Sequence, residues 1–164
     1  MKFDFELKKS LTDDELNECF EFMKSYLVEI YGEDAISREN FEIWKSNRSE
    51  KENRFFIKML DDEKACGYAE IAIQQQKRLY FADIIIKEEF RRTTIVYDFV
   101  KYVLGLEEFA KFDEVYLHIN KKNHTSYNTW KSFGLIELLQ GGSSNKYKIS
   151  RSGIEDFFNR SKSI

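Results

Sequence analysis

Apolar and polar residues alternate along the N-terminal part of the chain in patterns that predict one strand and two helices. Residues 2–8 alternate between apolar and charged side chains, which is typical of a strand. Thr12 and Glu15 have the spacing of a capping box, and the apolar stripe after them predicts a helix that ends at Gly32. A second, shorter helix is predicted to begin at Ser37.

The middle of the chain contains its most continuous apolar stretch. Residues 45–54 are almost wholly polar and indicate a loop. Residues 54–60 and 66–73 predict a hairpin of two strands. Residues 79–86 are apolar, aromatic or β-branched with a single charge, which favours a strand buried on both faces. Residues 95–104 then carry apolar side chains at helical spacing, so a strand, a turn and a helix follow one another.

The C-terminal third predicts three more strands around one helix. Residues 115–119 alternate as a strand, and Asn123 is a suitable cap for a helix over residues 126–133. Residues 135–139 and 146–149 predict two strands joined by a glycine- and serine-containing turn.

The last apolar cluster, Ile154, Phe157 and Phe158, predicts a docked helical turn. The expected order is therefore β-α-α-β-β-β-α-β-α-β-β, in which an antiparallel meander leads into one strand–helix–strand crossover. We expect a three-layer α+β fold with a mixed, mostly antiparallel central sheet flanked by helices. The length of 164 residues predicts a single domain over residues 1–164.

Composition narrows the class of protein. A hydrophobic content of 42% and a net charge of −3 fit a globular protein and give no sign of a nucleic-acid partner. The chain has no apolar run of 18 residues, so we expect no membrane partner. Its first residues do not resemble a signal peptide, which predicts a cytoplasmic location. Cys19 and Cys66 lack metal spacing, so we expect neither a disulfide framework nor a metal site, and we place Cys19 in the core.

Basic and hydroxyl side chains lie between the buried strand and the following helix, in the order Arg91, Arg92, Thr93 and Thr94. The N-terminus of a helix presents unpaired backbone N–H groups and a partial positive charge, which together favour an anion. A pyrophosphate group is the anion that we expect here. The alternative interpretation is an ordinary helix start with solvated arginines.

Two segments resemble the GCN5-related N-acetyltransferase (GNAT) family. In the first, Phe90 and Arg91 match the family's acyl-CoA loop, whereas Thr94 and Val96 stand where glycines are usual. The second spans residues 123–135. There Asn123 and Gly134 match the family pattern, Ser126 replaces a small residue and Trp130 replaces a tyrosine. The likeness covers roughly residues 54–150 and implies an acyl-CoA N-acyltransferase-like fold.

The resemblance implies acetyl-CoA as co-substrate. Backbone N–H groups from Arg92 to Val96 would hold its pyrophosphate, with added contacts from the threonine hydroxyls and the arginines. A backbone N–H near Ile86 would polarise the thioester carbonyl. The residues expected to bind acetyl-CoA are Ile84, Ile86, Arg91, Arg92, Thr93, Thr94, Ile95, Val96, Asn123, Ser126 and Trp130.

The expected catalytic residues are Glu70, Asp83 and Tyr127. Glu70 and Asp83 are acidic residues in otherwise apolar strands, so either could take the proton of an amine; the alternative is that both face solvent. Because the indole of Trp130 is no practical acid, Tyr127 or water would protonate the leaving thiolate. His118 lies on the other face of its strand from the buried positions, facing a helix or solvent.

The sequence thus predicts an N-acetyltransferase that moves an acetyl group to a primary amine by direct attack on the thioester. The acceptor would be an unidentified small molecule or peptide, and the assembly could include a homodimer. A second hypothesis is a binding or regulatory module that has lost catalysis, suggested by Thr94, Val96 and Trp130. A third is an adaptor for nucleic acid or protein that uses the basic residues 111–164.

Overall fold

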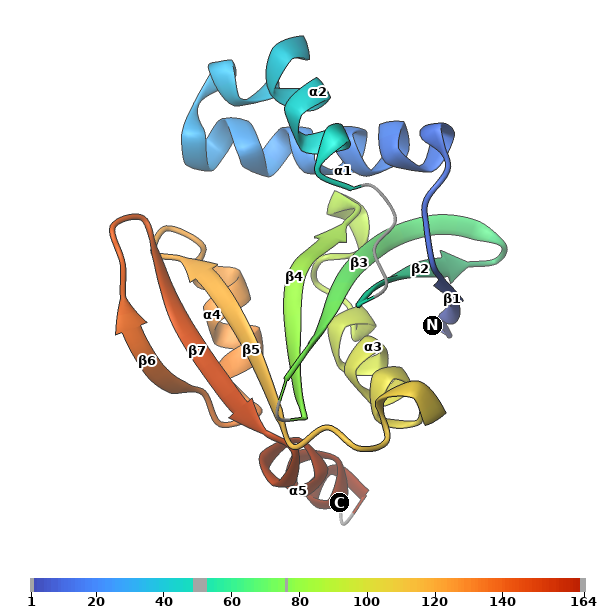
Figure 1. Cartoon of the computed structure of the whole chain (residues 1–164), viewed down its shortest axis with the longest axis vertical. Helices are drawn as coiled ribbons and strands as arrows, with labels where there is room; N and C mark the ends of the chain where they lie inside the picture. Colours follow the sequence, from blue (N-terminus) through green and yellow to red (C-terminus); the bar gives the residue numbers. More distant parts are fainter. Residues whose placement is uncertain (1, 49–52, 76, 163–164) are drawn as a thin grey trace. The chain divides into compact units, whose positions relative to one another are not determined.

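The computed structural model describes residues 2–48, 53–75 and 77–162, and Figure 1 colours the chain along its sequence. This described part contains seven strands, five α-helices and three short 3₁₀ helices. The strands are β1 (Asp4–Lys8), β2 (Arg54–Asp61), β3 (Lys64–Gln74), β4 (Arg78–Ile86), β5 (Glu114–Asn120), β6 (Ile136–Gln140) and β7 (Ser144–Ser150). The α-helices are α1 (Asp13–Tyr31), α2 (Arg38–Ser46), α3 (Ile95–Leu104), α4 (His124–Lys131) and α5 (Arg151–Lys162). The 3₁₀ helices are Glu33–Ile36, Glu88–Phe90 and Glu107–Phe109.

The strands form one sheet in the order β1-β2-β3-β4-β5-β7-β6. β1 pairs antiparallel with β2, β5 with β7, and β7 with β6, whereas β4 and β5 are parallel. Parallel neighbours need a crossover connection, which here contains α3. The mixed, mostly antiparallel sheet predicted from the sequence is thereby confirmed.

The chain forms two compact units, each of which includes part of β3 and part of β4. Unit 1 comprises residues 1–71 and 83–95, and unit 2 comprises residues 72–82 and 96–164. Each unit is described by itself below. The single domain predicted over residues 1–164 stays a prediction.

The core of unit 1 forms where the apolar stripe of α1 meets β3 and β4. Its central residues are Cys19, Phe20, Met23, Tyr68 and Ile85. The ring of Phe20 also packs against Phe41 of α2, with 4.5 Å between ring centroids. Cys19 is 1% exposed, which confirms its predicted place in the core.

The start of α1 is fixed by the predicted capping box. The backbone N–H of Glu15 donates to the hydroxyl of Thr12 (3.1 Å), and the backbone N–H of Thr12 donates to the carboxylate of Glu15 (3.0 Å). Lys8 and Lys58 each lie 3.1 Å from that carboxylate. Burial alone would raise the pKa of Glu15, but the Thr12 amide and the ammonium groups of Lys58 and Lys8 outweigh it and lower the pKa to about 2.

The core of unit 2 is aromatic. Phe81 of β4 packs against Phe99 of α3 and Trp130 of α4, with ring centroids 5.5 and 5.8 Å apart. Phe133, just after α4, packs 4.7 Å from Phe157 of α5. These aromatic contacts attach both helices and the C-terminal α5 to the strands of the unit.

A close backbone approach explains the glycine near the start of α5. A Cβ atom added at Gly153 would lie 2.9 Å from the carbonyl oxygen of Phe133 and 3.1 Å from the hydroxyl of Ser150. The absence of a side chain therefore lets α5 pack directly on the turn that follows α4.

The structure extends several predicted elements. α5 is a helix of 12 residues rather than one turn, and α4 begins at His124 rather than at 126. α2 continues to Ser46, inside the predicted loop 45–54, of which residues 49–52 lie outside the described part. Within the described residues, no helix is long and apolar enough to cross a membrane, and no group of three or more His, Cys, Asp or Glu could hold a metal ion.

Candidate active site

The parallel ladder between β4 and β5 stops before β5 ends. The paired residues run from Arg78 with Glu114 to Phe81 with Leu117, while β5 continues to Asn120. Beyond the last pair, main-chain N–H and C=O groups must find partners outside this ladder. The end of β5 pairs with β7, up to Asn120 with Ser144.

β4 leads into the β4–α3 loop, residues 87–94. The N–H of Lys87 donates to the carbonyl of Cys66 in β3 (2.9 Å), and a 3₁₀ turn over Glu88–Phe90 follows. Ile86, at the end of β4, is 7% exposed, and Ile84 is half-buried. The loop is therefore attached to the sheet on its strand side.

Arg91 attaches the same loop to α1. Its Nε donates to the carbonyl of Ile86 (2.9 Å), and its Nη2 donates to the carbonyl of Phe22 (2.8 Å). Its Nη1 lies 3.2 Å from the hydroxyl of Ser25, and the guanidinium carbon lies 5.6 Å from the ring centroid of Tyr26. The guanidinium that we expected to bind an anion is thus held by groups of the protein.

The remaining loop residues divide into internal and exposed ones. The hydroxyl of Thr93 donates to the carbonyl of Phe90 (2.6 Å) and accepts from the N–H of Ile95 (3.3 Å). Ile95 is fully buried, whereas Arg92 and Thr94 are exposed. The side chain of Thr94 therefore faces solvent at the start of α3.

α4 begins at the predicted cap. Asn123 accepts the backbone N–H of Ser126 through its side-chain oxygen (3.1 Å), which confirms its capping role. Ser126 is half-buried. Tyr127 is 37% exposed, with its ring 6.0 Å from that of Tyr147. Trp130 is only 4% exposed and belongs to the aromatic core of unit 2.

The two acidic residues that we expected to act as bases lie together in unit 1. Glu70 is 4% exposed, and its carboxylate oxygens lie 2.7 Å from Nε of Arg48 and 2.9 Å from Nε of Arg54. Arg48 also binds Asp83 through Nη2. The alternative expectation of two solvated carboxylates is therefore wrong for Glu70, and Arg48 bridges the pair.

A small cavity adjoins this charge cluster within unit 1. The guanidinium carbon of Arg48 lies 4.8 Å from the ring centroid of Trp44, so the indole covers one side of the bridging cation. The cavity is lined by Leu11, Cys19, Trp44, Arg48, Phe56, Tyr68, Ala69, Glu70, Asp83 and Ile85. It thus combines aromatic walls with two carboxylates and one guanidinium.

This fold and the β4–α3 loop can be compared with those of known proteins. The model of the acetyltransferase (GNAT) family matches residues 14–135, about three quarters of the chain. The chain belongs to the GNAT family. The resemblance inferred from two segments is therefore confirmed over a longer part of the sequence.

Solved GNAT structures share the fold at low sequence identity. The PaiA N-acetyltransferase from Thermoplasma acidophilum, in complex with coenzyme A, is 15% identical at a TM-score of 0.64, covering 90% of this chain and 99% of its own. An acetyltransferase from Thermus thermophilus is 13% identical at a TM-score of 0.67, and the match covers 92% of this chain and 97% of that one. The N-acetyltransferase PseH from Campylobacter jejuni, in complex with acetyl coenzyme A, is 12% identical at a TM-score of 0.60. That match covers 92% of this chain and 99% of PseH. The comparison with curated protein sequences finds no match.

The expected GNAT site residues fall in both units. Unit 1 contains Ile84, Ile86, the loop residues Arg91 to Thr94, Ile95 and the two carboxylates, and unit 2 contains Val96 and the expected residues of α4. Within unit 1 the structure brings Glu70 and Asp83 together through one arginine. Within unit 2 it buries Trp130 and exposes Tyr127, although both belong to α4.

The sequence did not predict two pairs of side chains that the structure brings into contact with other polar groups. Arg48 lies within the predicted polar loop 45–54 and Arg54 at its end, and the only signal in the sequence was that acidic residues in apolar strands need cationic partners. Tyr80 and His118 were also missed as a pair, although their strands were both predicted. The hydroxyl of Tyr80 and Nδ1 of His118 lie 2.9 Å apart. Local sequence patterns do not predict this contact, because the two residues are 38 positions apart.

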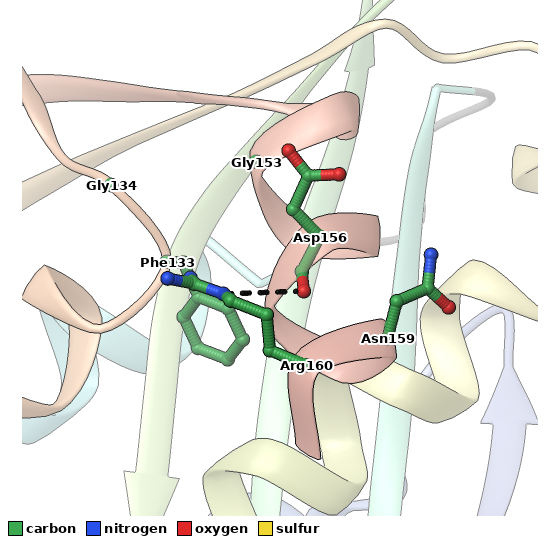
Figure 2. Close-up of a pocket in the computed structure, with 6 residues that line it drawn as sticks. All are labelled: Phe133, Gly134, Gly153, Asp156, Asn159 and Arg160. Carbon is green, nitrogen blue, oxygen red and sulfur yellow. Dashed lines mark hydrogen bonds between the residues drawn. The ribbon is translucent and has the colours of Figure 1, made fainter. Parts of the chain in front are cut away.

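A second hollow lies in unit 2 beside α5. Figure 2 shows Arg160 extending from α5 toward Phe133, where its Nε donates to the carbonyl of Asp156 (3.4 Å). The lining residues are Phe133, Gly134, Gly153, Asp156, Asn159 and Arg160. None of the expected GNAT site residues lines it, so we do not assign the reaction to this hollow.

Proposed function

We propose that this chain transfers the acetyl group of acetyl-CoA to a primary amine, which attacks the thioester directly. The observation that supports this most is the GNAT family match over residues 14–135. Two structural relatives were crystallised with coenzyme A or acetyl coenzyme A, which supports acetyl-CoA as the co-substrate.

The start of α3 is the proposed binding site for the pyrophosphate. The first N–H groups of a helix have no acceptor within the helix, and a backbone site does not depend on the type of side chain. The exposure of Thr94 supports this assignment, because a bulky residue at a glycine position is tolerable where its side chain faces solvent. Arg92 can add charge, whereas Arg91 would act by holding the loop in place. Ile84, Ile86, Asn123 and Ser126 remain proposed contacts of the co-substrate.

The acid and base remain proposals. Asp83 has a side chain that is 28% exposed and Glu70 one that is 5% exposed, so Asp83 has the better access to an acceptor. Tyr127, a residue that is 37% exposed, is the acid that the sequence suggests, whereas the buried Trp130 would contribute packing only. The acceptor is proposed only as a small-molecule or peptide amine, because the cavity of unit 1 has a volume of about 10 Å³, the space of a single water molecule, and its two carboxylates are paired with arginines.

Ligand binding and turnover test this proposal directly. Acetyl-CoA at 100 times its dissociation constant should stabilise the fold by about 2.7 kcal/mol, because it binds the native state only. We expect a clear rise in Tm with acetyl-CoA, and release of free thiol when a panel of diamines and lysine peptides is added. An unchanged Tm at millimolar acetyl-CoA would contradict the proposal.

A binding or regulatory module without catalysis is the second candidate. It is favoured by Thr94 and Val96 at the usual glycine positions and by the commitment of Arg91 to α1. This candidate predicts a rise in Tm with acetyl-CoA but no thiol release with any amine. Turnover above the rate of spontaneous aminolysis would exclude it.

A homodimer also remains a proposal. β6 lies at the edge of the sheet, and its aliphatic residues Ile136, Leu138 and Leu139 are 50%, 42% and 64% exposed. An exposed apolar edge strand favours pairing with a second copy. Sedimentation over a range of protein concentrations would measure whether such a dimer forms.

A further inference from the structure

Tyr80 and His118 form a polar pair across two parallel strands of unit 2. The hydroxyl of Tyr80 in β4 lies 2.9 Å from Nδ1 of His118 in β5, and the rings meet edge to face at 5.6 Å. In the ladder Tyr80 pairs with Tyr116, so His118 lies diagonally opposite, two residues further along β5. The pair therefore joins the two strands by side chains where their backbone pairing is about to end.

The position of the pair is chemically significant because the ladder stops at Phe81 and Leu117. His118 is the first residue of β5 beyond the last pair, and Tyr80 precedes the last paired residue of β4. Two proton-carrying side chains thus flank the point at which main-chain groups of parallel strands lose their ladder partners. His118 is exposed and Tyr80 is half-buried, so solvent and ligands can reach the imidazole.

The surroundings of His118 lower the pKa of its imidazole. Partial burial lowers the pKa of His118, and the ammonium of Lys146, its register partner on β7, lowers it further. Two more cations, Arg78 of β4 and Lys148 of β7, lie on the same face beside Tyr116. Glu114 lies 3.6 Å from Lys148 and accepts the hydroxyl of Tyr116 (3.0 Å).

A neutral imidazole at pH 7 can accept a proton, and a phenol hydrogen-bonded to it can donate one. The carboxylates of unit 1, by contrast, are already bound by arginines. In place of Asp83 and Tyr127, the candidates from the sequence, we propose that Tyr80 and His118 are the proton-transfer pair of the acetyl transfer, with the histidine as base and the tyrosine as acid. This inference rests on the proposed function.

The pair can complete the reaction without another donor. In the tautomer that we assign, Nδ1–H of His118 donates to the oxygen of Tyr80, and Nε2 takes a proton from the acceptor ammonium. The freed amine nitrogen forms the C–N bond with the thioester carbon, and the C–S electron pair leaves on sulfur. Tyr80 gives its proton to that sulfur and recovers one from Nδ1 of His118. The second proton of the amine leaves to water, so the products are an amide, a thiol and one proton. His118 is left as the Nε2–H tautomer and regains its Nδ1–H tautomer by proton exchange with water.

The test uses the full chain with acetyl-CoA and a diamine, and compares His118→Gln, Tyr80→Phe and the double variant. We expect each single change to lower kcat/KM about a hundredfold, within the range of general acid–base catalysis. The double variant should be no slower than the slower single one, because the two residues act as one relay. The fall of kcat/KM at acidic pH, which reports protonation of the base, should disappear in His118→Gln. Tyr116→Phe, on the same face, is the matched control and should keep wild-type activity.

A second readout needs no co-substrate. NMR titration of the ligand-free protein should show a lower pKa for His118 in Tyr80→Phe than in the wild type, because the lost phenol oxygen no longer stabilises the imidazolium. His118 is exposed on its strand, so His118→Gln should fold even if Tyr80→Phe does not. The rise in Tm with acetyl-CoA, equal to that of the wild type, would verify the fold of each variant.

The outcomes separate this inference from the proposed function. A wild type that neither binds acetyl-CoA nor releases thiol overturns both. A wild type that turns over, with His118→Gln and Tyr80→Phe within threefold of it, overturns the pair alone. If the fall of kcat/KM at acidic pH disappears in Asp83→Asn but persists in His118→Gln, the proposed roles of Tyr80 and His118 are wrong and the base is Asp83. A hundredfold loss of kcat/KM in both single variants supports the proposed pair, provided that the fall of kcat/KM at acidic pH disappears only in His118→Gln.

Discussion

Two backbone carbonyl oxygens, those of Ile86 and Phe22, receive the guanidinium of Arg91 at 2.9 and 2.8 Å. A planar guanidinium can donate to both at once and still cover the ring of Tyr26, whereas a lysine ammonium is a single point charge. Arg91→Lys should therefore lower the free energy of unfolding by about 1–3 kcal/mol. Urea unfolding would measure this, and Arg92→Lys at the neighbouring exposed residue is the control.

The same substitution tests the assignment of Arg91 to the fold rather than to an anion. If Arg91 mainly contacted the pyrophosphate, Arg91→Lys would weaken acetyl-CoA binding and leave the stability of the ligand-free protein unchanged. Loss of stability without ligand is the outcome that the hydrogen bonds to Ile86 and Phe22 predict.

At the scale of elements, α5 depends on the missing side chain of Gly153. Alanine is the better helix former by up to about 1 kcal/mol, but its Cβ would lie 2.9 Å from the carbonyl oxygen of Phe133. Gly153→Ala should therefore lower the stability of the protein by about 1–3 kcal/mol despite its higher helix propensity. Thermal unfolding shows whether the substitution raises or lowers the stability. A rise would mean that the carbonyl of Phe133 moves away from the new Cβ without loss of stability.

A matched control for this element is Asp156→Ala, which lies one turn further along α5 at an exposed position. It makes a similar gain in helix propensity without meeting the backbone of the α4–β6 turn. We expect it to raise the free energy of unfolding by up to about 0.7 kcal/mol, the difference in helix propensity between alanine and aspartate.

The elements themselves were largely predictable from local pattern. The capping box at Thr12 and Glu15 and the cap at Asn123 depend on neighbours three residues away, and both are confirmed. The length of α5 was not predictable, because its polar residues carry little periodicity and its stability comes from Phe133 in another element. The turn at Glu88–Phe90 likewise has no strong local signal.

The pH dependence of stability belongs to the whole molecule. The pKa of Glu15 is about 2 in the fold and 4.5 in the absence of its partners, so the unfolded chain binds more protons between these values. The stabilisation by this carboxylate is therefore complete above pH 4.5 and is lost as the pH falls toward 2, by at most about 3 kcal/mol. Urea unfolding at a series of pH values would measure the loss.

Glu15→Gln is the matched control for this pH dependence. Glutamine can still accept the backbone N–H of Thr12 in a capping box, but it has no proton to bind. The slope of stability against pH between 4.5 and 2 should flatten in this variant. An unchanged slope would assign the acid sensitivity to other carboxylates.

The long-range parts of the candidate site could not be predicted from the sequence. Arg48 meets Glu70 and Asp83 only because α2 ends beside the strands, and Arg91 meets Phe22 across 69 positions of the chain. Local sequence patterns predict the periodicity of an element and its caps. They do not predict which charged residues from distant segments will pair. The family resemblance located the loop, whereas the partners of its arginine required the structure.

The start of α3 also bears on how this chain can be compared with others. The proposed pyrophosphate site at the start of α3 would consist of peptide groups, which every amino acid supplies alike. Neighbouring residues can therefore be replaced over evolutionary time while the same array of peptide groups is preserved. A site of this kind is compatible with the low identity, 12–15%, at which the chain shares its fold with known acetyltransferases.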